Sequence, residues 1–280
     1  MNSQTKSEIF RDLHSKDGLF VLANVWDVGS AKMMAAMGFP ALATTSAGYA
    51  FSQGKIDWVG ALSREEVLDH AGELLNATDL PVSADLEDGY GATPEEVAKT
   101  VTLAGEIGLA GCTIEDTTGN KESPIYDFGL AKERIAAAVE AANALSHPFM
   151  LTARAENYLH GRPDLDDTIK RLQAFDEVGA DVLYAPGLPD LDAVRTVCRA
   201  TDKPINVVAG IGLPGVSIED LRDAGVKRVS LGSVLARTAI GAALNAASDI
   251  LEKGILNDAF GAAATFSHIE DLISAASNKA

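Results

Sequence analysis

A unit made of a helical segment, a glycine and a short apolar run recurs along this chain. It is clearest at "AAMGFPALATTS", "EIGLAGCTIED", "DEVGADVLYAP" and "RDAGVKRVSLG". Gly38, Gly108, Gly179 and Gly225 stand where the helical segments end, a position that favours positive φ and therefore glycine. Helices that alternate with short buried strands are typical of a parallel α/β fold.

Eight such strands are expected, with helices between them. The strand candidates are 19–24, 40–45, 81–87, 111–115, 148–154, 181–185, 204–208 and 226–231. The sequences "SREE" and "TPEE", at the start of the helical segments 63–78 and 93–107, read as capping boxes, and "SIED" is a weaker one. Eight strand–helix units favour a closed (β/α)₈ barrel, and the length of 280 residues suits one barrel domain over 1–280.

Two segments fall outside the repeating unit. The stretch 47–61 reads as an irregular insertion after the second strand. The alanine-rich region from about 237 to 280 reads as a C-terminal helical extension, which we expect in the subunit contacts of a dimer or tetramer.

The charge balance excludes several classes of partner. The chain has 23 Lys and Arg against 40 Asp and Glu, a formal net charge of −17, so it repels nucleic acid and anionic membranes. No uncharged apolar stretch is read as long enough to cross a bilayer. The polar N-terminus, and Cys112 and Cys198 without CxxC spacing, fit a reducing cytoplasm.

The segment "SADLEDGYG" (83–91) places three carboxylates at the end of a buried strand. Strand side chains alternate between faces, so Ser83, Asp85 and Glu87 share one face and the apolar residues between them share the other. The polar face should point into the barrel, with its acids at the carboxyl ends of the strands, where (β/α)₈ enzymes carry their active sites. Asp88 should point away and cap the turn or meet solvent.

The next two strands repeat this pattern. "CTIED" places Thr113 with Glu115, and "LTAR" places Thr152 with Arg154. Three inward carboxylates beside one arginine need a further cation, and a hard divalent ion with oxygen ligands suits them. Mg²⁺ is therefore expected, with Mn²⁺ as an alternative and zinc disfavoured for want of a His or Cys cluster. A buried network of acids and Arg154 without a metal is the other interpretation.

With these residues placed, the chain resembles the isocitrate lyase/phosphoenolpyruvate mutase superfamily over about residues 20–235. The segments that carry the resemblance, in family order, are "NVWDVGSAKMMAAMGFPALATTSAG", "ADLEDGYG", "GCTIEDTTG", "TARAENY", "VLYAPGL" and "RVSLGS". The resemblance implies bond formation or cleavage at the methylene carbon of a pyruvate-like unit, through an enolate.

The resemblance also implies roles for individual residues. The metal ligands would be Asp85, Glu87 and Glu115. The substrate carboxylate would bind the segment Ser46, Ala47 and Gly48, and the catalytic groups would include Asp57 and Arg154. Trp26, Asp85 and Asn206 are further candidates for substrate contact, and Asn120, Lys121 and Ser123 are the catalytic candidates in the loop after the fourth strand.

That loop departs from the family pattern. Lyases of the family carry a catalytic cysteine in a K-[KR]-C-G-H sequence there, whereas this chain has "TTGNKESPIYDFG". Phosphonopyruvate mutases and hydrolases carry a lysine and an Asn-Ser pair, and here the same residue types occur in a changed order. The departures argue against isocitrate and methylisocitrate cleavage and leave phosphonopyruvate chemistry and oxaloacetate decarboxylation open.

The sequence thus predicts a cytoplasmic, Mg²⁺-dependent lyase or phosphonomutase-like enzyme for a small 2-oxo or 2-hydroxy carboxylate. A 2-oxo-acid binding protein without catalysis is one alternative. An aldolase-type barrel with a Schiff-base lysine ranks last, because Lys203 and Lys227 stand at the starts of strands.

Overall fold

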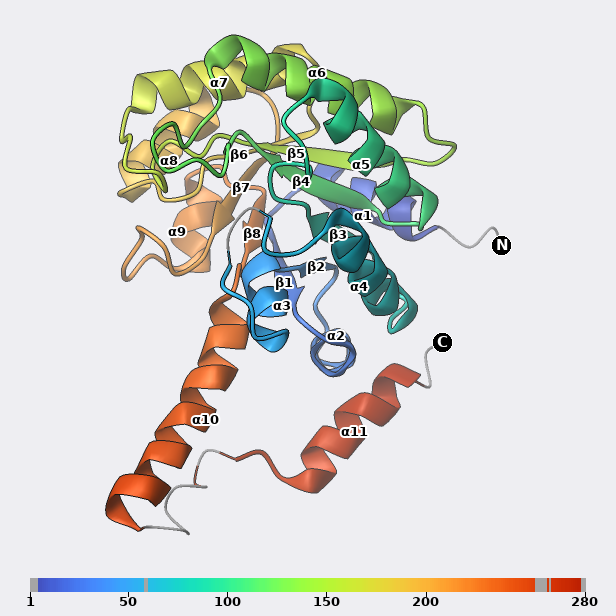
Figure 1. The fold of residues 1–280 in the computed structure, drawn as a ribbon, viewed down its shortest axis with the longest axis vertical. Coiled ribbons are helices and arrows are strands. Elements are labelled where there is room, and N and C mark those ends of the chain that lie inside the picture. Colours follow the sequence, from blue (N-terminus) through green and yellow to red (C-terminus); the bar gives the residue numbers. More distant parts are fainter. Residues whose placement is uncertain (1–4, 58–59, 255–260, 262, 278–280) are drawn as a thin grey trace.

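The computed structural model describes residues 5–57, 60–254, 261 and 263–277. Within them, eight parallel strands close into a barrel in which each strand pairs with its neighbours in sequence and β8 pairs with β1 (Figure 1). The expected (β/α)₈ barrel with extra C-terminal helices is confirmed. The strands are β1 (Phe20–Val25), β2 (Leu42–Thr44), β3 (Val82–Asp85), β4 (Gly111–Glu115), β5 (Met150–Arg154), β6 (Val182–Tyr184), β7 (Ile205–Val208) and β8 (Arg228–Ser230).

Helices cover the outside of the barrel. Those that follow the strands are α2 (Val28–Ala36), α3 (Ser46–Ser52), α4 (Arg64–Asn76), α5 (Pro94–Glu106), α6 (Phe128–Asn143), α7 (Leu165–Glu177), α8 (Leu191–Arg199), α9 (Ile218–Asp223) and α10 (Val234–Lys253). Helix α1 (Lys6–Ser15) precedes β1, and α11 (Phe266–Ser277) follows α10.

The local signals for helix ends behave largely as expected. The four repeat glycines have φ between 93° and 102°. Ser63 and Glu66 form a capping box, and so do Ser217 and Asp220. The second expected box is only half formed: Thr93 caps the backbone of Glu96, but the Glu96 carboxylate is paired with a distant arginine on α4 instead of the Thr93 backbone.

The stretch 47–61, expected to be irregular, begins as helix α3. Thr45 is its N-cap, and the Thr45 hydroxyl accepts a hydrogen bond from the backbone of Gly48 at 3.3 Å. A β-strand end followed by a capping threonine starts a helix even where the residues that follow show no apolar periodicity. Residues 58 and 59 of this stretch lie outside the described residues.

Helix α1 closes the N-terminal end of the barrel. Phe10 on α1 packs into a cluster of residues from the starts of the strands, and its ring meets that of His14 edge-on at 4.7 Å. His14 Nδ1 donates to the Phe10 carbonyl at 2.8 Å, which leaves Nε2 to accept from Arg228 Nη1 at 3.2 Å. Burial, and then the neighbouring Arg228, lower the pKa of His14 to about 3.

This geometry predicts a pH-dependent contribution to stability. A histidine whose folded pKa lies below its unfolded value stabilises the fold above the unfolded pKa and loses that contribution as the pH falls. Because His14 takes up a proton on unfolding as the pH falls, the free energy of unfolding should decrease by about 1.4 kcal/mol for each pH unit below roughly 6.5. Denaturant unfolding of wild type and His14→Gln between pH 7 and pH 4 measures it. Parallel pH profiles for the two proteins would contradict this assignment.

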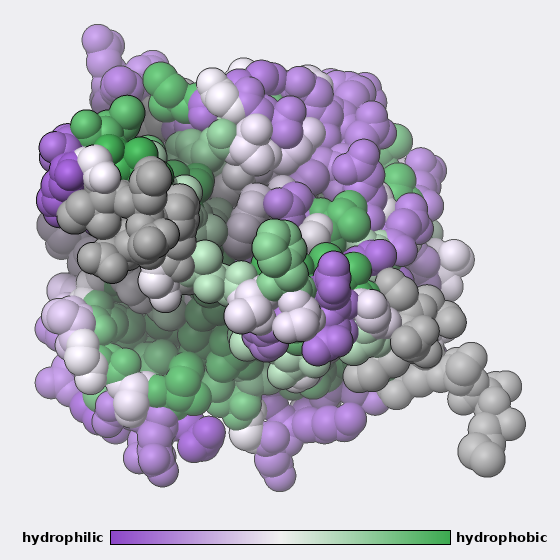
Figure 2. Space-filling view, turned by 90° about the horizontal axis from the view of Figure 1, so that it is seen from below, coloured by the Kyte–Doolittle hydropathy of each residue, from purple (hydrophilic) through white to green (hydrophobic). Residues whose placement is uncertain are grey.

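The C-terminal helices leave the barrel. Helix α10 projects from the barrel and α11 returns to pack on α2 (Figure 1). By length and composition, α10 is long and apolar enough to cross a membrane. The sequence-based expectation that no stretch is long enough is therefore wrong for this helix. The charges of α10 lie near its ends, and residues 238–248 carry none. Almost all of α10 lies outside the core, and Ile240, Leu244 and Leu251 are exposed on it. On the face from which these helices extend, Figure 2 shows apolar surface lining a hollow.

Candidate active site at the carboxyl ends of the strands

Two adjoining cavities of about 180 Å³ and about 240 Å³ lie at the carboxyl ends of the strands. They share Ser46, Asp57, Asp85, Arg154 and Leu159, so they form one site. The first reaches into the barrel, where its polar lining includes Asn24, Ser83, Tyr184, Asn206, Arg228 and Ser230. The second holds the remaining acids and is lined also by Glu87, Glu115, Thr117, Glu156 and His160.

Strand β3 aims its polar residues into this site as the alternation predicts. Val82, Ala84 and Leu86 are fully buried in the layer between strands and helices. Ser83 and Asp85 line the first cavity. The backbone of Asp85 donates to the Thr44 hydroxyl of β2 at 2.8 Å, which fixes the end of β3 against its neighbour.

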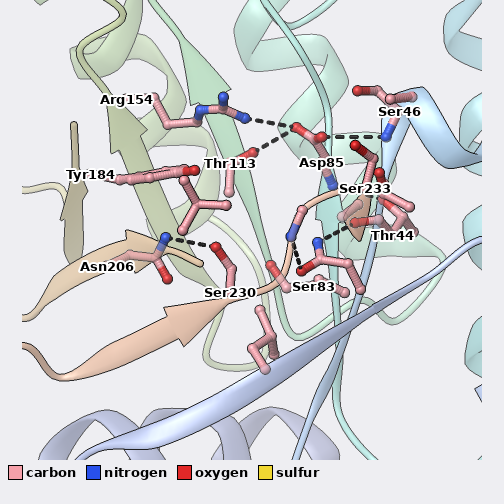
Figure 3. A pocket seen from close by; sticks show the side chains of 18 of the residues that line it. Thr44, Ser46, Ser83, Asp85, Thr113, Arg154, Tyr184, Asn206, Ser230 and Ser233 are labelled. Carbon is pink, nitrogen blue, oxygen red and sulfur yellow. Dashed lines mark hydrogen bonds and ion pairs between the residues drawn. The ribbon is translucent and has the colours of Figure 1, made fainter. Parts of the chain in front are cut away.

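Arg154, at the end of β5, is the centre of the site (Figure 3). Its Nη1 lies 3.1 Å from Asp85 Oδ1 and 2.7 Å from Glu115 Oε1, and its Nε lies 2.8 Å from Glu156 Oε1. Its guanidinium carbon lies 4.8 Å from the centre of the Tyr184 ring. Contacts on three sides hold the guanidinium in one orientation.

Asp85 has further donors around it. The Thr113 hydroxyl donates to Asp85 Oδ1 at 3.1 Å, and the backbone N–H of Ser46 donates to Oδ2 at 3.3 Å (Figure 3). The donors come from β4, β5 and the start of α3, so the position of this carboxylate depends on the pairing of these neighbouring strands.

Burial raises the pKa values of several acids in the site. Burial, and then the neighbouring Asp85, raise the pKa of Glu87 to about 8. Burial raises the pKa of Glu156 to about 7 and that of Glu115 well above its ordinary value, against the pull of Arg154. Burial and Asp85 also raise the pKa of Asp57. The pKa of Arg154 is raised despite its burial, because Glu115 and Glu156 face it.

The turn after β3 adopts strained backbone. Glu87 has φ of 47° and Tyr90 has φ of 57°, the left-handed region that residues other than glycine rarely adopt. Asp88 Oδ1 accepts from the Tyr90 N–H at 2.9 Å, so the expectation that Asp88 caps the turn is confirmed. Asp88 is 5 % exposed, so the alternative that it meets solvent is wrong.

Two arginines hold this turn from outside. Arg134 of α6, 1 % exposed, donates Nη1 to the Gly91 carbonyl at 2.6 Å and Nη2 to the Asp88 carbonyl. Arg64 of α4 donates to the Tyr90 carbonyl at 2.9 Å. Strained conformations persist where surrounding contacts over-determine them, and these two side chains supply such contacts.

We expect Arg134→Met to destabilise the protein, since it removes the donors to two carbonyls of the turn. An unsatisfied buried acceptor costs about 1–3 kcal/mol. Denaturant unfolding measures the change, and Arg195→Met serves as control because Arg195 is half-exposed and pairs with exposed Asp192. An Arg134 variant as stable as the control would show that the turn does not need this clamp.

The structure brings most of the candidate residues together. Those that line the site are Ser46, Ala47, Asp57, Asp85, Glu87, Glu115, Arg154 and Asn206. Trp26 and Gly48 do not line either cavity. A Cβ on Gly48 would lie 3.1 Å from Trp26 Cβ and 3.2 Å from Ala236 Cβ, so both residues pack α3 against the start of α10.

The loop candidates Asn120, Lys121 and Ser123 are exposed and line neither cavity. Their loop is held by its own hydrogen bonds, such as the Asn120 side chain accepting from the Glu122 N–H at 2.9 Å. Their catalytic role stays a prediction from the resemblance.

Other residues of the site were not singled out as site residues from the sequence. Glu156, 2 % exposed, orients Arg154 through its ion pair with Nε. Tyr184 and the pair Arg228 and Ser230 were missed. Alternation in "RVS" places Arg228 and Ser230 on one face, and this signal could have found them.

The donor set bears on whether a metal fits. Among the described residues, no three Asp, Glu, His or Cys side chains are arranged as a ready-made metal cluster. Glu87 Oε2, however, is buried and has no hydrogen-bond partner, and five carboxylates line the second cavity beside one arginine. Mg²⁺ is often held by one or two carboxylates together with water, so the residues present fit such an ion.

A (β/α)₈ barrel with a buried arginine among acids at the carboxyl ends of its strands is an architecture of enzymes that stabilise developing negative charge. Comparison with known proteins places this barrel among the lyases and mutases. The chain belongs to the phosphoenolpyruvate phosphomutase family, whose model matches residues 10–251, and so to the phosphoenolpyruvate mutase/isocitrate lyase superfamily.

Three similar proteins illustrate the relationship. A crystal structure from Burkholderia cenocepacia J2315, with the provisional description lyase/mutase, is 51 % identical with a TM-score of 0.91, covering 95 % of this chain and 94 % of that one. An uncharacterized protein of Mycobacterium tuberculosis is 35 % identical, over 85 % of this chain and 87 % of the relative. The 2-methylisocitrate lyase of Halalkalibacterium halodurans is 26 % identical, over 79 % and 73 %.

Proposed function

We propose that this protein is a Mg²⁺-dependent enzyme that forms or cleaves a C–C or P–C bond next to a 2-oxo acid, through a pyruvate enolate. The observation that carries the proposal is the fixed guanidinium of Arg154 at the cavity mouth, between Asp85 and Glu115. A preorganised cation in a buried site stabilises an oxyanion that develops during reaction far better than water does.

The crowded acids support a divalent ion. Asp85, Glu87 and Glu115 would hold Mg²⁺, or Mn²⁺ in its place. The ion would supply Lewis-acid stabilisation of an enolate oxygen. Its charge would also lower the free energy of ionising Glu87, whose carboxyl has a raised pKa and an unpartnered buried oxygen.

The chain's own residues would orient the substrate. Ser46 and Ala47 line the first cavity at the start of α3, where a substrate carboxylate would bind. Asn206 lines the opposite wall and donates to Ser230 at 3.0 Å (Figure 3). A cavity of about 180 Å³ suits a small 2-oxo or 2-hydroxy carboxylate.

The reaction need not use a cysteine. Cys112 is buried, Cys198 is half-buried, and neither lines the two cavities. This favours reactions that need only stabilisation of the enolate, such as oxaloacetate decarboxylation or phosphonopyruvate chemistry. It disfavours methylisocitrate cleavage.

An assay that measures pyruvate, glyoxylate and phosphoenolpyruvate tests the proposal, because isocitrate would release glyoxylate and a mutase would convert phosphonopyruvate to phosphoenolpyruvate. Oxaloacetate, phosphonopyruvate, isocitrate and methylisocitrate are offered with Mg²⁺, and we expect turnover of one of the first two. Arg154→Lys and Asp85→Asn should each lower kcat/KM at least about 100-fold, because each removes charge or donors from the enolate site. Chelation of the metal should abolish turnover, and Arg195→Lys should leave it unchanged. Full activity of either site variant would refute the assignment.

A 2-oxo-acid binding protein is the second candidate, favoured by the exposed positions of Asn120, Lys121 and Ser123. It predicts Mg²⁺-dependent thermal stabilisation by oxalate or pyruvate without turnover of any substrate in the panel. Catalytic release of pyruvate would eliminate it.

We also infer that α10 forms part of a subunit interface in a homodimer or homotetramer. Its exposed Ile240 and Leu244 lie one helical turn apart, and apolar surface of this kind on a soluble protein marks a contact site.

Light scattering after size exclusion tests this interface. Wild type should be oligomeric, and the double variant Ile240→Asp with Leu244→Asp should dissociate, because each carboxylate would be buried in the interface. Ile107→Asp, at the end of another helix, is the control. A monomeric wild-type protein would contradict the inference.

A further inference from the structure

The second cavity contains one imidazole. His160, in the segment between β5 and α7, lines it together with Asp85, Glu115 and Arg154. The other ionisable side chains among the described residues that line the two cavities are carboxylates, arginines and Tyr184. His160 is therefore the residue of this lining whose ordinary pKa suits proton transfer near neutral pH.

The hydrogen bonds around His160 define its tautomer. His160 Nε2 lies 3.2 Å from Thr117 Oγ1, and that hydroxyl donates to the Pro124 carbonyl at 3.1 Å. A hydroxyl has one proton, so both contacts are satisfied together only if His160 Nε2–H donates to Thr117. The neutral ring then carries its lone pair on Nδ1.

Four of the five carboxylates that line the second cavity are poorly placed to carry protons for the substrate. Glu115 and Glu156 are each held by a direct ion pair with Arg154. Asp85 accepts from Thr113 and Ser46 as well as from Arg154, and Glu87 is a proposed metal ligand. Proton transfer from Asp85, Glu115 or Glu156 would break the arrangement that holds the guanidinium.

We propose that His160 is the catalytic acid–base residue that moves the proton between solvent and the methylene carbon of the enolate. In the forward sense the imidazolium Nδ1–H bond breaks and a C–H bond forms at that carbon, with the enolate pair supplying its electrons. In reverse, Nδ1 takes a proton from the methyl group of pyruvate and the electron pair moves to the enolate oxygen. The role rests on the proposed function and assigns the protein to a lyase or decarboxylase, since a mutase needs no such proton.

The surroundings of the ring support this role. Burial lowers the pKa of His160, and Arg154 and Arg162 lower it further, so the neutral base is the resting form at neutral pH. The site carboxylates Asp57, Asp85, Glu87, Glu115 and Glu156 line the same cavity and would stabilise a transient imidazolium.

Hydrogen–deuterium exchange at the methyl group of pyruvate in D₂O, followed by proton NMR with Mg²⁺ present, tests this proton transfer without any bond cleavage. His160→Gln keeps a donor for Thr117 but cannot carry a proton, so we expect exchange at least about 100-fold slower. His268→Gln, on exposed α11, is the matched control and should exchange like wild type. In His160→Ala, added imidazole should restore part of the exchange, which a purely structural role would not allow.

A second readout does not depend on activity. In the NMR spectrum of ¹⁵N-histidine-labelled protein, the signals of His160 are those that are present in wild type and absent from His160→Gln. These signals should show a protonated Nε2 and an unprotonated Nδ1. The opposite tautomer, or exchange at the wild-type rate in His160→Gln, would overturn the role of His160 while leaving the proposed function intact. Wild type that neither exchanges pyruvate nor turns over any substrate would overturn both.

Discussion

The buried guanidinium of Arg154 is the charge on which the rest of the site depends. Removing a charge from water is costly unless it is paired, and Arg154 pairs with acids from three strand ends, Asp85, Glu115 and Glu156. Asp85 ends β3, Glu115 ends β4 and Glu156 follows β5, so the pairing of these neighbouring strands brings the acids together. Because five acids line the second cavity, Arg154 satisfies some of their charge and leaves the remainder for a cation.

At the opposite end of the barrel, a second arginine is buried without an acidic partner among its described hydrogen bonds. Arg228 is 1 % exposed and has no carboxylate partner among its described hydrogen bonds, which go to Asn206, Thr152 and His14. Burial accordingly lowers the pKa of Arg228 to about 10. A neutral His14 is required there, since an imidazolium would face the guanidinium. The charge of the barrel interior therefore changes from negative at the mouth to positive at the floor. This arrangement would attract an anionic substrate inward.

The sequence predicts most of what depends on local periodicity. Alternation places Ser83, Asp85, Thr113 and Arg154 on the inner face, and helix-ending glycines mark the repeats. Glu87 could be assigned to the correct face but not to its strained turn, because that conformation is imposed by Arg134 and Arg64 from helices distant in sequence. Likewise nothing local distinguishes His160 from a solvated loop histidine, since the Thr117 contact spans 43 residues.

The arrangement of the acids and His160 separates two demands that enolate chemistry makes on one site. In the proposed reaction the oxyanion would require fixed positive charge, which Arg154 would supply only while Glu115 and Glu156 hold it in place. The carbon requires a group that changes its protonation state during each turnover. A carboxylate that served both purposes would release the guanidinium each time it took a proton. His160 shares the cavity but is not one of the acids that hold the guanidinium of Arg154, so a change in its protonation would leave those ion pairs in place.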